Sequence, residues 1–143
     1  MNILLVEDNP GDVRLTKEAL KEARFFDNVN LSVVPDGEAA LHFLKRQGKY
    51  VNEATPDLIF LDLNLPKVDG RQVLKEIKED RHLRVIPVVV LTNSEATQDI
   101  QKSYDLHANC YITKPVDINR FFEVIKSIEN FWFSIVQLPR QNL

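Results

Sequence analysis

The feature that most constrains the fold of this chain is a short, uninterrupted apolar run that ends in a carboxylate. Ile59, Phe60 and Leu61 lead directly into Asp62, and Pro66 follows as a turn residue. Such a run, bounded by turn residues, is typical of a strand that is buried on both faces of a sheet. Asp62 would then lie at the carboxyl end of that strand, where open α/β sheets bind their ligands. A carboxylate in that position requires a compensating charge nearby.

Strand-like and helix-like segments alternate along the whole chain. Further strands are expected at 2–6, 29–34, 88–92 and 110–113. Helices are expected at 11–24, 37–46 with Asp36 as its N-cap, 70–80, about 93–107 and about 116–133, and 47–56 is expected to be a surface loop. Five strand–helix units with continuously apolar central strands predict an α/β fold in which helices cover both faces of a parallel sheet.

Length, charge and cysteine content exclude several classes of protein. A chain of 143 residues suits one domain. The net charge of −3, with no block of basic residues, argues against nucleic acid as the main partner. Cys110 is the single cysteine, which excludes an internal disulfide and fits a reducing compartment. The N-terminus lacks the basic start of a signal peptide, and no apolar stretch approaches the roughly 20 residues of a membrane span. We therefore expect a cytoplasmic protein without membrane contact.

Polar side chains follow four of the predicted strands. Glu7 and Asp8 end the first strand, Asp62 the third, Thr92 the fourth and Lys114 the fifth. Because the carboxyl ends of parallel strands meet at one edge of the sheet, these groups are expected to converge. The pattern therefore predicts one functional site assembled from distant parts of the chain.

The chemistry of this set points to phosphoryl transfer. Three crowded carboxylates repel one another and need a cation. Since the set holds oxygen ligands and no His or Cys, it favours Mg²⁺ over Ca²⁺ or Mn²⁺ and excludes a structural zinc. An aspartate can act as a nucleophile and form an aspartyl phosphate, and an ion, a lysine and a hydroxyl can hold the phosphoryl oxygens.

Four motifs make the chain resemble the receiver domains of response regulators in two-component signalling, over about 2–133. They are LLVEDN at 4–9, LDLNLP at 61–66 with Asp69 and Gly70, VLT at 90–92, and YITKP at 111–115. The resemblance implies a flavodoxin-like (βα)5 doubly wound sheet with strand order 2-1-3-4-5. It also implies a receiver domain over 1–133 and a tail over 134–143 with no separate output domain.

The same resemblance assigns roles to individual residues. Asp62 would be the phosphoacceptor for a sensor histidine kinase, and the protein would not be an enzyme in the usual sense. Mg²⁺ would be bound by Asp8, Asp62 and the main-chain carbonyl of Asn64, with Glu7 acting through water. Lys114 would contact the phosphoryl group, through a cis bond to Pro115. Thr92 and Tyr111 would be the switch pair that alters the face formed by helix 4, strand 5 and helix 5.

Softer features resemble the stand-alone receivers that serve cyanobacterial phytochrome histidine kinases. They are the segment 106–114, the long loop 47–56, and the ending 128–132 with Leu138 and Pro139. Two positions depart from the common receiver pattern. His107 stands where many receivers have Gly, so a cap without a left-handed residue is expected there. Ser94 occupies the second position after Thr92, which leaves the phosphoryl lifetime open.

The last predicted helix carries more apolar residues than one buried face needs. Val124, Ile128, Phe131 and Ile135 form a second row at helical spacing. A wide core stripe, or cover from the tail, is one interpretation. The other is a partner surface, and we predict a homodimer that uses this row.

Two functions from other classes also use a doubly wound sheet. A phosphatase of the haloacid type has an Asp nucleophile, but it needs a second carboxylate two residues later, where this chain has Asn64. A carrier of flavin mononucleotide needs a hydroxyl-rich phosphate loop after the first strand. Here Asn9, Pro10, Gly11 and Asp12 follow it, and their acidic character would repel a phosphate.

Overall fold

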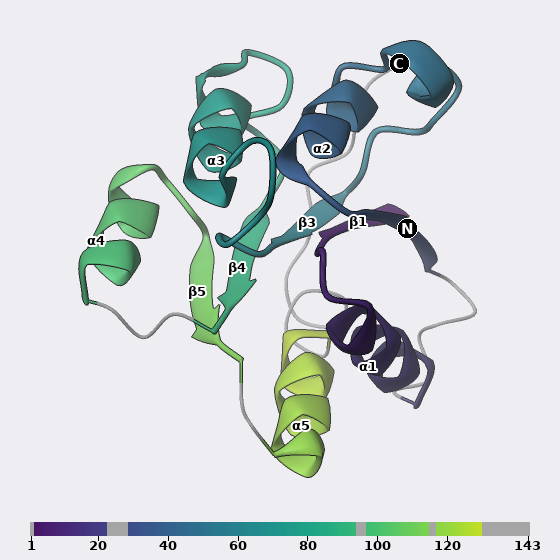
Figure 1. Ribbon diagram of the computed structural model, residues 1–143, viewed down its shortest axis with the longest axis vertical. Helices are drawn as coiled ribbons and strands as arrows, with labels where there is room; N and C mark the ends of the chain where they lie inside the picture. Colours follow the sequence, from purple (N-terminus) through teal and green to yellow (C-terminus); the bar gives the residue numbers. More distant parts are fainter. Residues whose placement is uncertain (1, 23–28, 94–96, 115–116, 130–143) are drawn as a thin grey trace.

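Five short strands form one parallel sheet in the predicted order β2-β1-β3-β4-β5 (Figure 1). The strands are β1 (Asn2–Val6), β2 (Asn30–Val34), β3 (Leu58–Leu61), β4 (Val88–Thr92) and β5 (Cys110–Thr113). The computed structural model describes residues 2–22, 29–93, 97–114 and 117–129. Because β3 is the central strand, the residue that follows it lies in the middle of the sheet edge.

Helices cover both faces of the sheet. They are α1 (Pro10–Glu22), α2 (Gly37–Leu44), α3 (Gly70–Glu79), α4 (Thr97–Asp105) and α5 (Ile118–Glu129), with a 3₁₀ turn, η2 (Gly48–Tyr50), in the predicted loop. Helices α1 and α5 lie on one side of the sheet, and α2 and α3 lie on the other (Figure 1). None of the helices in the described ranges combines the length and the apolar character that a membrane crossing requires.

Aspartate side chains fix where three of these helices begin, and at the start of α3 Asp69 accepts a hydrogen bond from the backbone N–H of Arg71 at 2.8 Å. Asp36 accepts a hydrogen bond from the backbone N–H of Ala39 at 2.7 Å, which confirms the predicted N-cap of α2. Asp117 accepts one from the N–H of Arg120 at 3.0 Å at the start of α5. Each cap satisfies one of the donors that the first turn of a helix leaves unpaired.

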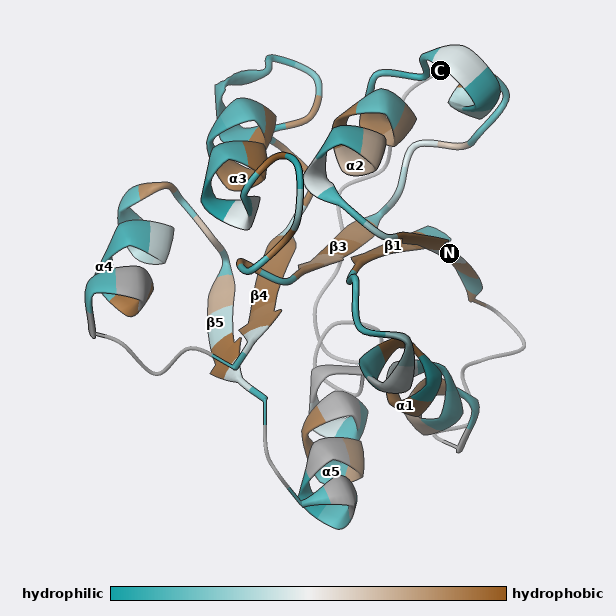
Figure 2. Cartoon of the chain, in the orientation of Figure 1, coloured by the Kyte–Doolittle hydropathy of each residue, from teal (hydrophilic) through white to brown (hydrophobic). Residues whose placement is uncertain are grey.

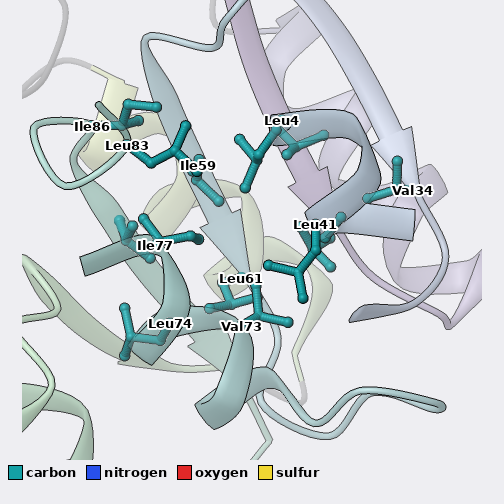
Figure 3. Close-up of a cluster of buried hydrophobic side chains, with 14 of the residues drawn as sticks. Leu4, Val34, Leu41, Ile59, Leu61, Val73, Leu74, Ile77, Leu83 and Ile86 are labelled. Carbon is teal, nitrogen blue, oxygen red and sulfur yellow. The ribbon is translucent and has the colours of Figure 1, made fainter. Parts of the chain in front are cut away.

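The strands send alternate residues into two separate apolar clusters. Leu4 and Val6 of β1 join the cluster under α2 and α3, whereas Ile3 and Leu5 join the cluster on the α1 side. The central strands β3 and β4 alternate in the same way. Figure 3 shows the first cluster, and in Figure 2 the strands β1, β3 and β4 are the most uniformly apolar elements. Burial on both faces explains why these strands are apolar without interruption.

The predicted cap at the end of α4 is wrong, because His107 itself adopts the left-handed conformation, with φ of 69°. Its N–H donates to the carbonyl of Tyr104 at 2.9 Å, and the N–H of Ala108 donates to the carbonyl of Ser103 at 2.9 Å. These two bonds form a Schellman motif, in which glycine is the usual left-handed residue. The hydrogen bonds thus hold a histidine in a backbone conformation that is strained for a residue with a Cβ.

Replacing this histidine with glycine should stabilise the protein. We expect His107→Gly to raise the free energy of unfolding by about 0.5–1 kcal/mol, because glycine adopts a positive φ without strain. Urea unfolding of the parent and the variant measures the change. His82→Gly is the matched control, since His82 is not among the positive-φ residues of the described chain and glycine there should destabilise. A His107→Gly variant no more stable than the parent would contradict the assignment of strain.

Candidate functional site

The predicted polar side chains meet at the carboxyl edge of the sheet. Glu7 and Asp8 follow β1 directly, and Asp62 follows β3. The N–H of Glu7 donates to the carbonyl of Val34, and that of Asp62 to the carbonyl of Val6, each at 3.1 Å. These bonds continue the backbone pairing one residue beyond the strands. The sheet therefore determines where both acidic residues sit.

Three carboxylates at this edge are close enough to share one metal ion. Glu7, Asp8 and Asp62 each offer an oxygen, and these oxygens lie within 4.8 Å of one another. Glu7 and Asp62 are buried, at 3% and 6% exposure, whereas Asp8 is exposed. The donors are all hard carboxylate oxygens, which suits a divalent cation of the Mg²⁺, Mn²⁺ or Ca²⁺ type. The three carboxylates that were expected to converge therefore lie close together.

Lys114 provides a positive charge inside this group of acids. Its side chain is only 3% exposed, and its Nζ contacts a carboxylate oxygen of Glu7, Oδ2 of Asp12 at 2.9 Å and Oδ2 of Asp62 at 3.3 Å. Its backbone N–H donates to the carbonyl of Thr92 at 2.7 Å, so β4 positions the residue. Burial lowers the pKa of Lys114, but the contacts with Glu7 and Asp12 and the charge of Asp62 outweigh that effect and raise it. The surrounding carboxylates therefore stabilise the cationic form of this lysine.

Glu7 has the most perturbed carboxyl group of the described chain. Burial raises the pKa of Glu7 to about 7, and the negative charge of Asp62 acts in the same direction. The hydrogen bond and the charge of Lys114 oppose that rise. Burial thus makes the ionised form of Glu7 costly, and the contact with Lys114 offsets part of that cost.

The loop that follows Asp62 packs directly on the start of α3. The N–H of Asn64 donates to Oδ1 of Asp62 at 3.1 Å, and the N–H of Gly70 donates to the carbonyl of Leu63 at 2.9 Å. A Cβ at Gly70 would lie 2.3 Å from the carbonyl oxygen of Asp62 and 2.5 Å from Cα of Leu63. Only glycine allows this approach, so Gly70 determines how the Asp62 loop rests on the helix.

Thr92 and Tyr111, predicted as a switch pair, lie on neighbouring strands. Thr92 is fully buried, and its hydroxyl has no hydrogen-bond partner among the described residues. Tyr111 is half-buried and packs against the cluster under α2 and α3. Its backbone N–H donates to the phenolic oxygen of Tyr104 at 3.2 Å, which joins β5 to α4. A buried hydroxyl without a partner is costly and is available to a new acceptor.

Of the four residues predicted for a dimer surface, only Val124 has a described side chain. Val124 is half-buried and packs, with Phe122, against the cluster on the α1 side. This contact fits the alternative interpretation of a wide core stripe at that position. The side chain of Ile128, and Phe131 and Ile135 entirely, lie outside the described residues, as do Ser94, the Lys114–Pro115 bond and the tail 134–143.

Asp12 is a site residue that the sequence did not reveal. It lies in the first turn of α1, and the sequence around it indicated only a turn and a helix start. Its carboxylate is 2.9 Å from Nζ of Lys114, a residue 102 positions away in the chain. One signal was available, because the first turn of a helix that follows a strand lies at the same sheet edge as the end of that strand.

Comparison with known proteins agrees with this geometry. The family model of the response regulator receiver domain matches residues 3–126. The response regulator Rcp1 of Synechocystis sp. is 50% identical over 137 residues, which are 96% of this chain and 92% of Rcp1. The range that the family model matches includes all four motifs, from 4–9 to 111–115.

Two solved structures have the same fold. The phosphorylated cyanobacterial phytochrome response regulator RcpA superposes with a TM-score of 0.92 at 50% identity, covering 97% of this chain and 98% of RcpA. The Mn²⁺-bound form of Rcp1 superposes with a TM-score of 0.92 at 49% identity, covering 97% and 99%. Sequence, fold and the acidic strand ends agree, and the chain belongs to the response regulator receiver domain family, the phosphoacceptor proteins of two-component signalling.

Proposed function

We propose that Asp62 is the residue that accepts a phosphoryl group from a sensor histidine kinase. The observation that carries the proposal is the place of this carboxylate. It follows the central strand, it lies with Glu7 and Asp8 in a cluster of oxygens within 4.8 Å, and its Oδ2 is 3.3 Å from Nζ of Lys114. A carboxylate at the middle of the edge, next to a buried cation, can be stabilised after it has reacted.

In the transfer, an oxygen of the Asp62 carboxylate forms a bond to phosphorus. The bond between phosphorus and the histidine nitrogen of the kinase breaks, and its electron pair stays on the imidazole. The ammonium of Lys114 donates to one phosphoryl oxygen, and the hydroxyl of Thr92 donates to another. Positioned donors of this kind stabilise charge on a transferring phosphoryl group.

Mg²⁺ is the ion that we propose for the site. Asp8, Asp62 and the backbone carbonyl of Asn64 would hold it, with Glu7 acting through water. When bound, the ion supplies positive charge that offsets the phosphoryl oxygens. The all-oxygen donor set supports this choice, and so does the Mn²⁺-bound form of Rcp1, because Mn²⁺ and Mg²⁺ share a preference for oxygen ligands.

The signal would pass from Asp62 to the face formed by α4, β5 and α5. The buried Thr92 hydroxyl moves toward the phosphoryl group, and Tyr111 changes its side-chain position in the space that Thr92 leaves. The hydrogen bond from Tyr111 to Tyr104 supports this route, because it ties β5 to α4. Phosphorylation is then a local change of charge that biases a two-state surface.

Acetyl phosphate with Mg²⁺, followed by intact-mass measurement, tests the proposal. We expect the parent protein to gain one phosphoryl group and Asp62→Asn to gain none. Asp105→Asn is the control, since Asp105 is exposed on α4 and contacts Gln101, and it should be phosphorylated like the parent. An adduct that persists in Asp62→Asn would show that another residue is the acceptor. Steady hydrolysis of simple phosphate esters would favour the phosphatase instead.

The similarity to Rcp1 and RcpA favours a phytochrome-type histidine kinase as the phosphodonor. The transfer would take place in the cytoplasm, where the kinase domain would bind ATP. The autophosphorylated kinase should transfer its phosphoryl group to this protein faster than a histidine kinase with an unrelated sensor does. Equal transfer rates from both kinases would contradict the phytochrome assignment.

A homodimer formed through the α4–β5–α5 face is part of the same proposal. The apolar row on the last helix, with Ile128 and Phe131, is the sequence feature that supports it. Sedimentation velocity should show that Phe131→Asp shifts the protein toward the monomer, because a charge in an apolar interface is costly to bury. A variant as dimeric as the parent would place the interface elsewhere.

A further inference from the structure

Lys114 has one carboxylate partner that does not belong to the metal cluster. Its ammonium contacts Glu7, Asp12 and Asp62, and two of these three acids also belong to the cluster that fits a divalent cation. Asp12 is the exception. Its side chain is 24% exposed, and its Oδ2 lies 2.9 Å from Nζ of Lys114, closer than Oδ2 of Asp62 at 3.3 Å. The site thus contains one carboxylate, that of Asp12, which contacts Lys114 and is not part of the group that could bind the metal ion.

The backbone around Asp12 is held in place on both sides. Its N–H donates to Oδ1 of Asn9 at 3.1 Å, and its carbonyl accepts a hydrogen bond from the hydroxyl of Thr16 at 2.8 Å. Thr16 is 1% exposed, so the second bond lies at the buried side of α1. The backbone of Asp12 is therefore held in place independently of Lys114.

A metal ion and Lys114 compete for the same oxygens. An ammonium has three N–H donors, and here three carboxylates receive them. A divalent ion bound by the cluster repels the ammonium of Lys114 and attracts the carboxylates of Glu7 and Asp62. Lys114 then needs a partner of its own if it is to stay beside Asp62 while the ion is present.

We propose that Asp12 is a positioning residue that serves as the dedicated counter-ion of Lys114. Asp12 keeps the ammonium beside Asp62 when Glu7 and Asp62 interact with a bound divalent cation. The ammonium and the metal ion can then occupy the same site. The inference rests on the proposed function, since it concerns the lysine that contacts the phosphoryl group. The experiment that tests the role of Asp12 needs no phosphorylation, so the proposed role of Asp12 and the proposed function of Asp62 can be refuted separately.

Calorimetric titration of the full chain with Mg²⁺ tests the role of Asp12 in a double-mutant cycle. Without the Asp12 charge, Lys114 binds more tightly to Glu7 and Asp62, so we expect Asp12→Asn to weaken Mg²⁺ binding about tenfold. In the Lys114→Met background the competitor is gone, and the same change should weaken binding by no more than about twofold. Asp12→Glu, which keeps the charge, should restore the parent affinity to within about twofold. Equal factors in both backgrounds would overturn the proposal, because Asp12 would then act on the ion directly.

The matched control is Glu18→Gln, which removes a charge from an exposed position of α1. It should leave the affinity nearly unchanged, and a tenfold loss there would show a general charge effect. If Lys114→Met does not fold, Lys114→Gln replaces it in the cycle.

Nitrogen NMR of the lysine ammonium groups provides an independent measurement. In saturating Mg²⁺, the parent should keep a slowly exchanging Lys114 signal, and Asp12→Asn should lose it. An Asp12→Asn protein that keeps this signal would also overturn the proposal.

Discussion

Gly70→Ala should reduce the stability of this protein and the reactivity of Asp62 together. The added Cβ would lie 2.3 Å from the carbonyl oxygen of Asp62, so either α3 or the loop after Asp62 has to move. Overpacking against backbone is costly, and we expect a loss of about 3 kcal/mol in the free energy of unfolding. Because the atoms that the new Cβ would meet belong to Asp62 and Leu63, phosphorylation by acetyl phosphate should slow at least tenfold even at temperatures where the variant is folded.

Gly48→Ala is the matched control for this substitution. A Cβ at Gly48 meets nothing within 4 Å, although its φ of 59° makes an alanine strained. The control should lose only about 1 kcal/mol and should be phosphorylated at the parent rate. Urea unfolding and the time course of the mass adduct measure both properties. Equal loss in the two variants would mean that the close approach of α3 to Asp62 is unimportant.

Lys114→Met should destabilise the protein most strongly at alkaline pH. The variant leaves Glu7, Asp12 and Asp62 without their buried cation, and removing one partner of a buried ion pair costs about 3 kcal/mol or more. The folded pKa of Glu7, about 7, already lies above its value of 4.5 in the unfolded chain. The folded state therefore binds more protons, so this contribution to stability is present below pH 4.5 and is lost as the pH rises through 7. Without Lys114 the pKa of Glu7 rises further, and the loss continues above that pH.

Urea unfolding at pH 8 and pH 5, with and without Mg²⁺, tests this expected pH dependence of the free energy of unfolding. The difference between the parent and Lys114→Met should be largest at pH 8 without the ion, and smaller at pH 5, where carboxylates become protonated. Mg²⁺ should reduce the difference at pH 8, because it replaces the missing positive charge. Lys75→Met, at an exposed position of α3, is the control and should change the stability by less than about 0.5 kcal/mol. A larger loss at pH 5 than at pH 8 would contradict the electrostatic origin.

The fold and most of the site could be predicted because the responsible signals are local. A strand that is buried on both faces has no position for a polar residue, so uninterrupted runs of apolar residues in the sequence indicate β3 and β4. The residue after each run then lies at the functional edge of the sheet, which brings Glu7, Asp62 and Lys114 together. Knowing the topological rule is enough to expect the meeting of residues that are up to 107 positions apart.

The two features that were missed depend on three-dimensional detail. The contact of Asp12 with Lys114 requires that the first turn of α1 aims this carboxylate toward β5, which no local pattern encodes. The left-handed His107 was not expected, because intrinsic preference disfavours it. The two hydrogen bonds that close α4 outweigh that preference. In both cases the packed structure, and not the residue type, decides the conformation.

The separation of the core into two clusters has a consequence for how proteins of this kind diversify. The two clusters share no residue of the described chain, and the sheet lies between them. Substitutions beneath α2 and α3 can therefore compensate for one another in volume without a matching change in the cluster on the α1 side. A change in the packing of one face should therefore leave the strand ends, and the acidic residues that follow them, in place.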